Sequence, residues 1–519
     1  MSTHEQATAE PRRRVVITGA GLVSPLGDSP AALHQALVAG TSGRKPVELF
    51  DTTGIGCTEG GEIRPFEPQG YVGDRNLRPL DRTSRLLVVA AQLALADSGW
   101  AAVLRGGAGG AGGRPPAGGT GSPAGPGTGA GAVAAGAGAG TPGGGTEAAA
   151  AGGPAEPSAP GAPLAEQVEV GLVVGTTFCS VRTIAEFDRR AIRLGPTHAS
   201  PLDFANSVIN AAAGQAAIWH GLRGVNSTLA GGEASGLLAI AQAAEMIRAG
   251  RADAVLAGGA EELCFESFFG YHRAGRLCGS RRGAAGAATG GEGAGGPAAV
   301  AERPVPFDAR RNGFSLAEGA ALLVLEEAGT AAGRGATVHA EVLGWGAAFA
   351  AQEGEAGMAA AVARAVRLAL ADAGAAPAAI GFLSASASGS IEVDRAEALG
   401  VAAALNGRAA ALPVTAIKAM LGEGLGVSAA WQAIDAVETL GDGMLPGIAG
   451  LETLELGLPL PGAEAATRQL PLLARRLALV TAVGADGHCA ALVVGAPPAP
   501  AAGGQATGKG APGVRETAP

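Results

Sequence analysis

The sequence predicts an α/β fold in which two similar halves stack sheets and helices in layers. Short apolar runs of strand length alternate with longer runs whose apolar residues recur every three or four positions, and this alternation is typical of sheets covered by helices. Two segments, each a glycine-rich loop followed by a helix, resemble one another and indicate an internal duplication. With 519 residues the chain has room for one large double domain or for two core-bearing units.

Buried strands are expected where short apolar runs are bounded by turn residues. These runs lie at residues 15–18, 168–174, 254–257, 320–325, 338–343, 380–384, 477–483 and 490–494. Helices are expected where apolar side chains repeat with the helical period. The main ones lie at residues 83–97, 234–248, 358–373 and 428–440.

The two similar segments place a glutamate in front of a helix. Their loops read Gly231-Gly232-Glu233 and Gly422-Glu423-Gly424. The helix that follows each loop has a single apolar stripe, so each is expected to bury one face. The helices stop at Gly250 and Gly441, residues suited to the left-handed conformation of a helix C-terminus. We interpret the pair as two halves that face one another.

The segments between these elements suggest where the chain divides. We assign residues 13–262 to an N-terminal half and residues 263–497 to a C-terminal half. Residues 106–163 and 282–302 consist almost entirely of Gly, Ala, Pro, Ser and Thr, and the tails at 1–12 and 498–519 are similar. Such tracts bury too little surface to offset the entropy of ordering, so we predict inert insertions and disordered tails.

The composition excludes several classes of function. The formal net charge of −9 argues against binding to a nucleic-acid backbone, and the 3% aromatic content argues against base stacking. No uninterrupted apolar stretch reaches the roughly 18 residues of a membrane span. Arg12 to Arg14 and the short apolar run after them resemble an export signal, but Gly19 and Gly21 interrupt the run. We therefore expect a cytoplasmic protein with no membrane or nucleic-acid partner.

The sequence shows no motif for a cofactor or a metal. Gly19 and Gly21 follow a strand as in a dinucleotide fingerprint, but Ser24 stands where the third glycine belongs. The five cysteines form no CxxC pair, which indicates a reducing compartment and no zinc site. The histidines show no HxxxH or HExxH spacing, and His488 is expected in a hairpin turn. We expect neither cofactor nor metal.

The loop around Glu233 has the form of a nucleophile elbow with the wrong residue. Small residues surround Glu233 at the start of an Ala-rich helix, where elbows carry Ser or Cys. A carboxylate is a poor attacker of thioesters. Acidic residues at a helix N-terminus are stabilised by about 0.3–1 kcal/mol. We therefore expect Glu233 and Glu423 to cap their helices or to fill the site, rather than to act as general bases.

Outside the low-complexity tracts, the chain resembles the β-ketoacyl-ACP synthases of the thiolase fold. The resemblance is specific and runs along nearly all of the foldable sequence. It is carried by Val15 to Gly21 with Ser24 to Gly27, Leu80 to Arg85, Ser200-Pro201 through Asn210 to Gln215, Ala257 to Glu261, Pro306 to Asp308 with Arg311 to Phe314, Glu318 to Ala320, and Pro413 to Lys418. The resemblance implies two pseudo-symmetric βαβαβ halves that form an α-β-α-β-α domain.

The same resemblance identifies an altered active site. In the family a cysteine attacks the acyl thioester, and two histidines assist decarboxylation and stabilise the enolate. At the matching positions this chain has Glu233, Ser386 and Glu423, and only Lys418 remains. The loop whose phenylalanine gates the family's pocket reads Gly484-Ala485-Asp486-Gly487. Condensation needs a thiolate and imidazole donors, so we expect the chain to be inactive by itself.

The altered site resembles that of the chain-length-factor subunits of type II polyketide synthases. This implies a heterodimer with an active ketosynthase, acting on chains carried by an acyl carrier protein in polyketide or fatty-acid elongation. We expect residues 200–217 at the interface and Phe178, Phe187 or Phe204 near the tunnel.

Three alternatives remain open at this stage. The first is a malonyl-ACP decarboxylase or priming enzyme, and the second is a pseudoenzyme that binds acyl-ACP. The third is an ordinary condensing enzyme that uses Cys179 or Cys489 as its nucleophile.

Overall fold

The expected alternation of strands and helices is present in the computed structural model, which describes residues 12–74, 76–107, 168–280, 301–352, 354–470 and 477–497. Most of the predicted low-complexity tracts, residues 1–11 of the predicted N-terminal tail and the whole predicted C-terminal tail lie outside these residues. At the edges of the tracts, residues 106–107 end a helix and residues 301–302 are described as well.

The eight predicted strands all occur, and six of them differ in length from the prediction. The main sheet consists of β1 (Val15–Val23), β4 (Val170–Gly175), β5 (Asn226–Leu229), β6 (Ala254–Glu261), β7 (Gly319–Glu327), β8 (Ala340–Phe349), β9 (Ile380–Ser384), β10 (Val414–Thr415), β13 (Leu477–Val483) and β14 (His488–Gly495). Two short pairs lie apart from it: β2 (Lys45–Pro46) with β3 (Glu59–Gly60), and β11 (Met444–Leu445) with β12 (Arg468–Gln469).

The helices cover this sheet. They are α1 (Pro30–Val38), α2 (Gln69–Val72), α3 (Arg82–Asp97), α4 (Trp100–Gly107), α6 (Val181–Leu194), α7 (Pro201–Ala205), α8 (Ala211–His220), α9 (Ser235–Arg248), α10 (Phe265–Arg273), α11 (Ala328–Gly333), α12 (Glu355–Asp372), α13 (Ile391–Leu405), α14 (Lys418–Leu421) and α15 (Ser428–Asp442). Short 3-10 turns are η1 (Pro196–His198), η3 (Pro377–Ala379), η4 (Arg408–Ala411) and η5 (Leu425–Val427). Within the described residues, none of these helices combines the length and the apolar character that crossing a bilayer requires.

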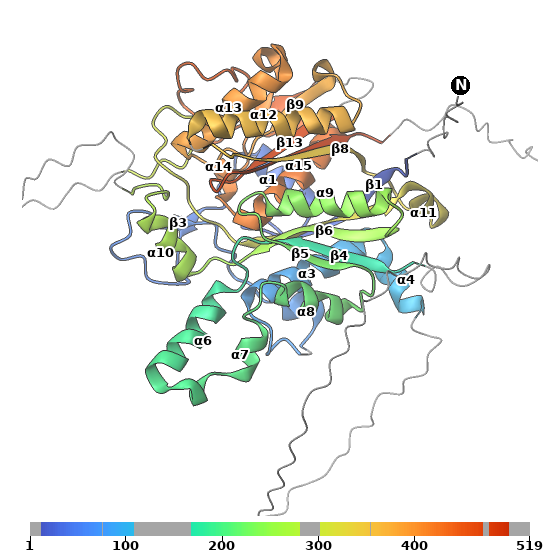
Figure 1. Cartoon of the computed structure of the whole chain (residues 1–519), viewed down its shortest axis with the longest axis vertical. Coiled ribbons are helices and arrows are strands. Elements are labelled where there is room, and N and C mark those ends of the chain that lie inside the picture. Colours follow the sequence, from blue (N-terminus) through green and yellow to red (C-terminus); the bar gives the residue numbers. More distant parts are fainter. Residues whose placement is uncertain are drawn as a thin grey trace, which may run out of the picture.

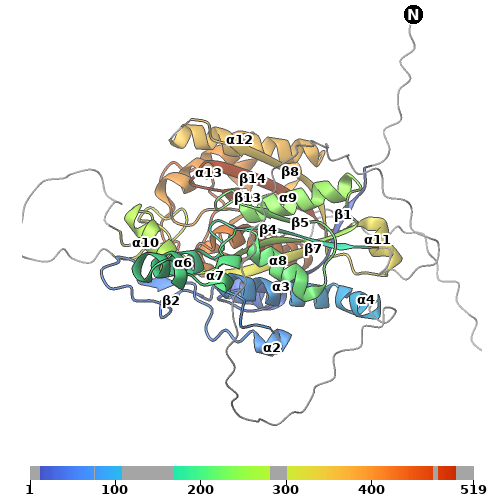
Figure 2. The ribbon, with the colours of Figure 1, turned by 60° about the horizontal axis from the view of Figure 1, so that its bottom comes forward.

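The elements stack in five layers, as the thiolase-like fold class predicts. Helices α12 and α13 form one outer layer, and α3 and α8 form the other (Figure 1). Between them lie two layers of strands, which enclose α9 and α15 in the centre. The same order is visible after a 60° turn (Figure 2). The predicted layered arrangement is therefore confirmed.

The two strand layers belong to one continuous hydrogen-bonded ladder. Its order is β10-β9-β13-β14-β8-β1-β7-β6-β4-β5. Strand β1 joins the layers, because it pairs along its length with β7 and through Val15 to Ile17 with β8. β7 follows residue 263 in the chain but pairs with β6 and β1, so the boundary predicted at 262/263 does not separate the layers.

The helix ends agree only in part with the glycines expected to terminate them. Gly250 follows α9 in the left-handed region with a φ of +67°. The prediction for Gly441 is wrong: α15 continues through it to Asp442, and Gly443 takes the left-handed conformation with a φ of +80°. Gly443 N–H reaches Thr439 O, so the later glycine closes the helix.

Close backbone packing in the centre brings the two similar loops together. A Cβ at Gly236, in the first turn of α9, would lie 2.4 Å from Gly426 O. A Cβ at Gly259, on β6, would lie 2.0 Å from the same oxygen. Only residues without a side chain permit this approach. As a result, the loop before α9 and the loop before α15 meet at the midplane of the molecule.

Candidate active site

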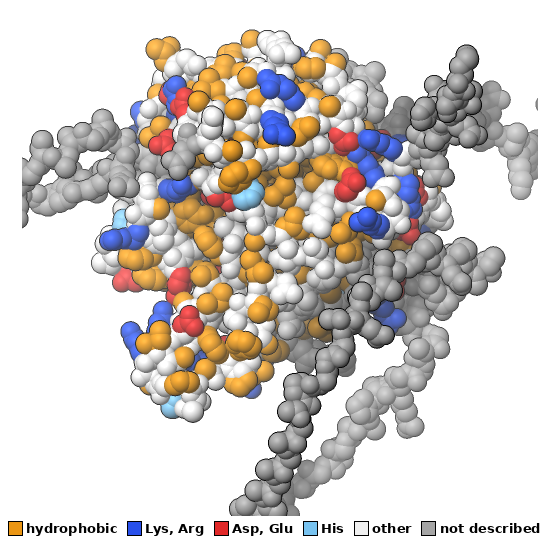
Figure 3. All heavy atoms as spheres, in the orientation of Figure 1, with side chains coloured by type: hydrophobic (Ala, Val, Ile, Leu, Met, Phe, Trp, Pro, Cys, Tyr) orange, Lys and Arg blue, Asp and Glu red, His pale blue; other side chains and the backbone are white. Residues whose placement is uncertain are grey.

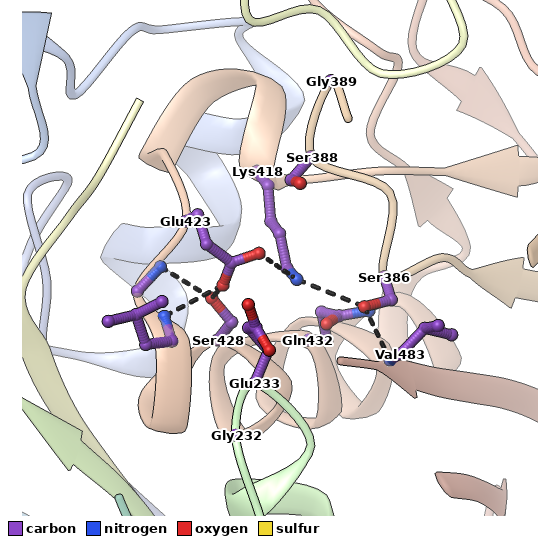
Figure 4. A network of polar contacts seen from close by, with 12 residues as sticks. Gly232, Glu233, Ser386, Ser388, Gly389, Lys418, Glu423, Ser428, Gln432 and Val483 are labelled. Carbon is purple, nitrogen blue, oxygen red and sulfur yellow. Dashed lines mark hydrogen bonds and ion pairs between the residues drawn. The ribbon is translucent and has the colours of Figure 1, made fainter. Parts of the chain in front are cut away.

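The four residues predicted from the sequence gather at this meeting point. Glu233 lies in the loop between β5 and α9, and Ser386 follows β9. Lys418 begins α14, and Glu423 lies between α14 and η5. Their relative exposures are 7%, 3%, 2% and 3%, so all four are withdrawn from water. Figure 4 shows the side chains of Glu233, Ser386 and Glu423 arranged around the ammonium group of Lys418.

Lys418 connects two of the other three residues. Its Nζ donates to Glu423 Oε2 at 2.7 Å and to Ser386 Oγ at 3.2 Å. The second oxygen of Glu423 accepts from Ser428 Oγ at 2.7 Å and from Leu425 N at 2.9 Å. Glu423 therefore has a cation and two further donors, which together compensate the burial of its charge.

Ser386 is fixed from the opposite side. Its Oγ accepts from Val483 N at 3.0 Å, and its own N–H donates to Glu397 Oε1 at 2.7 Å. Thr481 Oγ1 donates to the same oxygen of Glu397 at 2.6 Å. Burial raises the pKa of Glu397 to about 7. These hydrogen bonds hold the Ser386 hydroxyl in one position. A serine hydroxyl donates and accepts hydrogen bonds but does not titrate near neutral pH.

The carboxylate of Glu233 has much less compensation for its burial. Among the described residues, Tyr271 Oη is the one side-chain group that donates to its carboxylate, at 3.4 Å. Burial raises the pKa of Glu233, the negative charges of Glu423 and Asp486 raise it further, and Lys418 opposes them. These effects favour the neutral acid, in which one oxygen carries a proton.

Of the two roles predicted for Glu233, capping its helix or filling the site, the capping role is wrong. Helix α9 begins at Ser235 with Ala234 as its N-cap residue, and in the described structure no side chain bonds to that cap. Ser235 Oγ instead accepts from Gly231 N at 2.8 Å. Glu233 precedes the cap, and its side chain extends toward Glu423 (Figure 4). Glu423 does not cap its helix either, because α15 begins at Ser428 with Val427 as its N-cap residue. The carboxylate of Glu423 accepts from Leu425 N instead.

A cavity of about 560 Å³ opens at Glu233. Phe178, Tyr271 and Asp486 line it together with Glu233. Asp486 belongs to the loop where the sequence resemblance expects a gating phenylalanine, and it lies against Gly232. Of the three predicted tunnel residues, Phe178 lies at this cavity. The other two, Phe187 and Phe204, pack together on α6 and α7, with ring centroids 5.8 Å apart.

The two cysteines that an ordinary condensing enzyme would use are poorly placed. Cys179 and Cys489 are buried, and burial raises the pKa of each thiol to about 12. Neither residue lines the cavity at Glu233. A thiol with such a pKa is almost entirely protonated at neutral pH and attacks thioesters weakly.

Sequence reasoning missed three residues that shape the site. These are Tyr271, Glu397 and Ser428. For Ser428 a signal exists, because it follows Gly424 by four positions as Ser235 follows Gly231. Tyr271 and Glu397 come from α10 and α13, and no local pattern marks them. His488 lies at the start of β14, and its Nδ1 is 3.0 Å from Asp486 Oδ2. It does not line the cavity.

Comparison with protein-family models yields two matches that together span most of the chain. The N-terminal domain of β-ketoacyl synthases matches residues 12–112 and 155–331, and the C-terminal domain of the same family matches residues 339–452.

Two curated relatives illustrate the range of the family. The ketoacyl synthase beta subunit of the tetracenomycin polyketide synthase from Streptomyces glaucescens is 31% identical, over 92% of this chain and 98% of the relative. The 3-oxoacyl-[acyl-carrier-protein] synthase 2 of Vibrio cholerae is 29% identical, over 86% of this chain and 91% of the relative.

Solved structures agree on the fold. The ishigamide ketosynthase/chain length factor superimposes with a TM-score of 0.73 at 24% identity, covering 94% of this chain and 100% of the other. A type II polyketide ketosynthase in complex with its acyl-carrier protein gives a TM-score of 0.70 at 22% identity, with coverages of 94% and 100%. With both family domains matched and the thiolase-like layers present, this chain is a member of the β-ketoacyl synthase family.

Proposed function

We propose that this chain is a non-condensing ketosynthase-like subunit of the chain-length-factor type. It pairs with an active β-ketoacyl-ACP synthase during polyketide or fatty-acid chain elongation. The observation that carries the proposal is Glu233, a buried carboxylate at the position where the family resemblance places the nucleophilic cysteine.

The electrostatics of the site support the absence of condensation. The ammonium group of Lys418 is bound by Glu423, so it is not free to receive a substrate carboxylate. A malonyl group entering the cavity meets Glu233 and Asp486, which line it, and Glu423 behind them. The negative charge of Asp486 repels a malonyl carboxylate, and Glu233, which its surroundings favour in the neutral form, offers neither a thiolate nor a cation to the substrate.

The surface of α6, α7 and α8 supports a protein partner. Large apolar side chains stand exposed there, with Ile192 at 82% and Ile218 at 80%. Others on this surface are Leu194, Leu202, Phe204, Val208 and Ile209. Apolar atoms gather on the projection formed by α6 and α7 (Figure 3). A cluster of this kind on one face is typical of an interface, and four of its members, Leu202, Phe204, Val208 and Ile209, lie in the region 200–217 predicted to form one.

The relatives point in the same direction. One is described as the beta subunit of a polyketide ketosynthase, and one structure contains a ketosynthase with a chain length factor. Another contains an acyl-carrier protein bound to its ketosynthase. We therefore propose an active ketosynthase and an acyl carrier protein as the partners of this chain.

The first test is a condensation assay with the isolated protein. Supplied with malonyl-ACP and an acyl-ACP, it is expected to form no 3-oxo product. The variant Glu233→Cys introduces a thiol into the cavity, so we expect alkylation at residue 233 but still no condensation, because no imidazole stands at Ser386 or Glu423. Formation of a 3-oxo product by the unaltered protein would contradict the proposal.

The second test concerns pairing. Native mass spectrometry of this chain mixed with candidate active ketosynthases is expected to show a one-to-one heterodimer with one of them. The variant Phe204→Asp places a charge on the exposed apolar surface and is expected to weaken pairing at least tenfold. Leu456→Asp is the matched control, because Leu456 is 95% exposed and lies far from α6 in the sequence. Homodimers alone, or equal effects of both variants, would count against the proposal.

The same preparations examine the decarboxylase alternative. Release of carbon dioxide from malonyl-ACP by the isolated protein, abolished in Glu233→Ala, would replace the non-catalytic assignment with a priming activity. We expect no release above the level of malonyl-ACP alone.

A further inference from the structure

Two cysteines far apart in the sequence lie side by side outside the site described above. Cys57 and Cys278 are separated by 221 positions, and their Sγ atoms are 3.2 Å apart. Their neighbours explain this proximity: a Cβ at Gly56 would lie 2.3 Å from Gly279 O, and a Cβ at Gly279 would lie 2.3 Å from Gly56 O. The two backbones are therefore in direct contact, and the packing of the chain itself brings the sulfurs together.

A carboxylate completes a group of three donors. Glu302 Oε2 lies 3.7 Å from both sulfurs. Its other oxygen, Oε1, accepts from Thr58 N at 2.8 Å and from Thr58 Oγ1 at 2.6 Å. These bonds hold the carboxylate in the orientation that directs Oε2 at the thiols. Supporting hydrogen bonds of this kind are typical of metal ligands.

The distances fit a divalent cation. The three donor atoms form a triangle with sides of 3.2, 3.7 and 3.7 Å. A point about 1 Å above its plane is about 2.3 Å from all three, which is close to the usual zinc–sulfur distance. We propose that Cys57, Cys278 and Glu302 bind a zinc ion.

The chemistry of the donors favours zinc over hard cations. Two thiolates and one carboxylate are ligands that select Zn²⁺ over Mg²⁺ or Ca²⁺. On binding, each thiol releases one proton to solvent, and the carboxylate, already ionised, releases none. Both cysteines are fully buried while Glu302 is half-buried, so a solvent molecule reaches the fourth position from the Glu302 side.

A disulfide is the competing use of two adjacent thiols. It would need an oxidant, such as a disulfide of the glutathione class, to accept two electrons. The negative charge of Glu302, whose Oε2 lies 3.7 Å from both sulfurs, has no part in a disulfide. The same charge is an asset to a cation. The position of Glu302 therefore favours the metal.

The absence of CxxC motifs does not argue against this site. That expectation concerns ligands close in the sequence, whereas these three come from separate segments. Cys57 precedes β3, Cys278 follows α10, and Glu302 lies beyond residues 281–300. Cys57 and Cys278 belong to the apolar cluster that contains Phe268 and Leu425, with Tyr271 packed against it. An ion there would brace the wall of the cavity at Glu233.

Cobalt provides a direct probe of the site. We expect the reduced, metal-free full-length protein to bind one Co²⁺ with the thiolate-to-cobalt absorption and visible bands of a tetrahedral site. Cys57→Ser and Cys278→Ser should each weaken binding at least tenfold. Cys264→Ser is the matched control, because Cys264 is equally buried but lies outside the group. A spectrum without thiolate absorption, or one lost equally in Cys264→Ser, overturns the proposal.

Two further variants distinguish the role of the Glu302 carboxylate from that of Thr58, which orients it. Glu302→Gln removes the charged donor and is expected to weaken Co²⁺ binding more than Thr58→Val. The Thr58 variant loses only the hydroxyl that orients Glu302, for which a loss of about tenfold is expected. Equal affinity in Glu302→Gln and the unaltered protein would show that the carboxylate is no ligand.

Alkylation of the unaltered protein distinguishes metal from disulfide without any variant. In protein unfolded directly into alkylating reagent after loading with Zn²⁺, all five cysteines should be modified without reductant. In the folded protein, zinc should slow alkylation of Cys57 and Cys278 and a chelator should restore it. If these two cysteines become reactive only after reduction, they form a disulfide and the metal assignment is wrong.

Discussion

The two loops that precede α9 and α15 share one backbone device and differ in the treatment of their glutamates. In the first, Gly231 N donates to Ser235 Oγ at 2.8 Å, and in the second, Gly424 N donates to Ser428 Oγ at 2.8 Å. Each serine follows its glycine by four residues, so the duplication recognised in the sequence extends to a matching hydrogen bond.

The carboxylates of Glu423 and Glu233 differ in their hydrogen-bond partners. The carboxylate of Glu423 accepts hydrogen bonds from Lys418 Nζ, Ser428 Oγ and the backbone N–H of Leu425. The carboxylate of Glu233 accepts one long hydrogen bond, from Tyr271 Oη at 3.4 Å, and borders a cavity. A buried charge remains in place when partners surround it, and a buried acid without a cation is driven toward its neutral form. Glu423 is therefore part of the folded framework, whereas Glu233 modifies the cavity.

The largest expected effect comes from removing the cation. Lys418→Met leaves Glu423 buried without its ammonium partner, which is expected to cost about 3–5 kcal/mol of unfolding free energy. Lys418→Met combined with Glu423→Gln should recover much of that loss. Urea denaturation followed by tryptophan fluorescence measures both. Lys45→Met, which changes an exposed lysine on β2, is the control, and an equally small effect in Lys418→Met would break the comparison.

A smaller difference is expected between the two matching serines. Ser428→Ala removes a donor to the Glu423 carboxylate, and hydrogen bonds to charged groups contribute about 1.5–3 kcal/mol. Ser235→Ala removes bonds to the neutral carbonyls of Gly232 and Thr176, for which about 1 kcal/mol is expected. The same denaturation assay compares them. If both substitutions cost the same, the loops do not differ as described.

The smallest effect concerns the pH dependence of Glu233. Because burial raises its pKa above that of the unfolded chain, the folded state holds this proton more tightly. Its contribution is present below the ordinary pKa of glutamic acid and is lost as the pH rises through the raised value. Glu233→Gln has no such loss, so its stability relative to the unaltered protein should increase with pH, by about 1 kcal/mol at the alkaline end.

The exposed Glu245 on the same helix supplies the control for this titration. Glu245→Gln makes the same substitution at an exposed position of α9, so it measures the effect of the substitution apart from the burial of Glu233. The same pH dependence in Glu233→Gln and Glu245→Gln would mean that the acid is not perturbed by its surroundings.

Much of the fold could be predicted from the sequence because its signals are local. The apolar runs at residues 380–384 and 477–483 coincide with β9 and β13, and the period of residues 83–97 matches α3 to within one residue. The end of α15 was misplaced because Gly441 and Gly443 are equally suited to a left-handed cap, and the sequence does not rank them.

For the site, the sequence identifies the residues, but it does not determine their surroundings. Family motifs single out Glu233, Ser386, Lys418 and Glu423, and the chemistry of a carboxylate already argues against thioester attack. Which glutamate pairs with Lys418, which faces a cavity, and which thiols meet are decided by packing between segments far apart in the chain. Those contacts depend on where the sheet layers and central helices bring backbones within a few ångströms, as at Gly426 and at Gly279. Local sequence patterns therefore determine the helices, the strands and the chemical type of each site residue. Only the tertiary structure decides which charged side chains are buried next to one another.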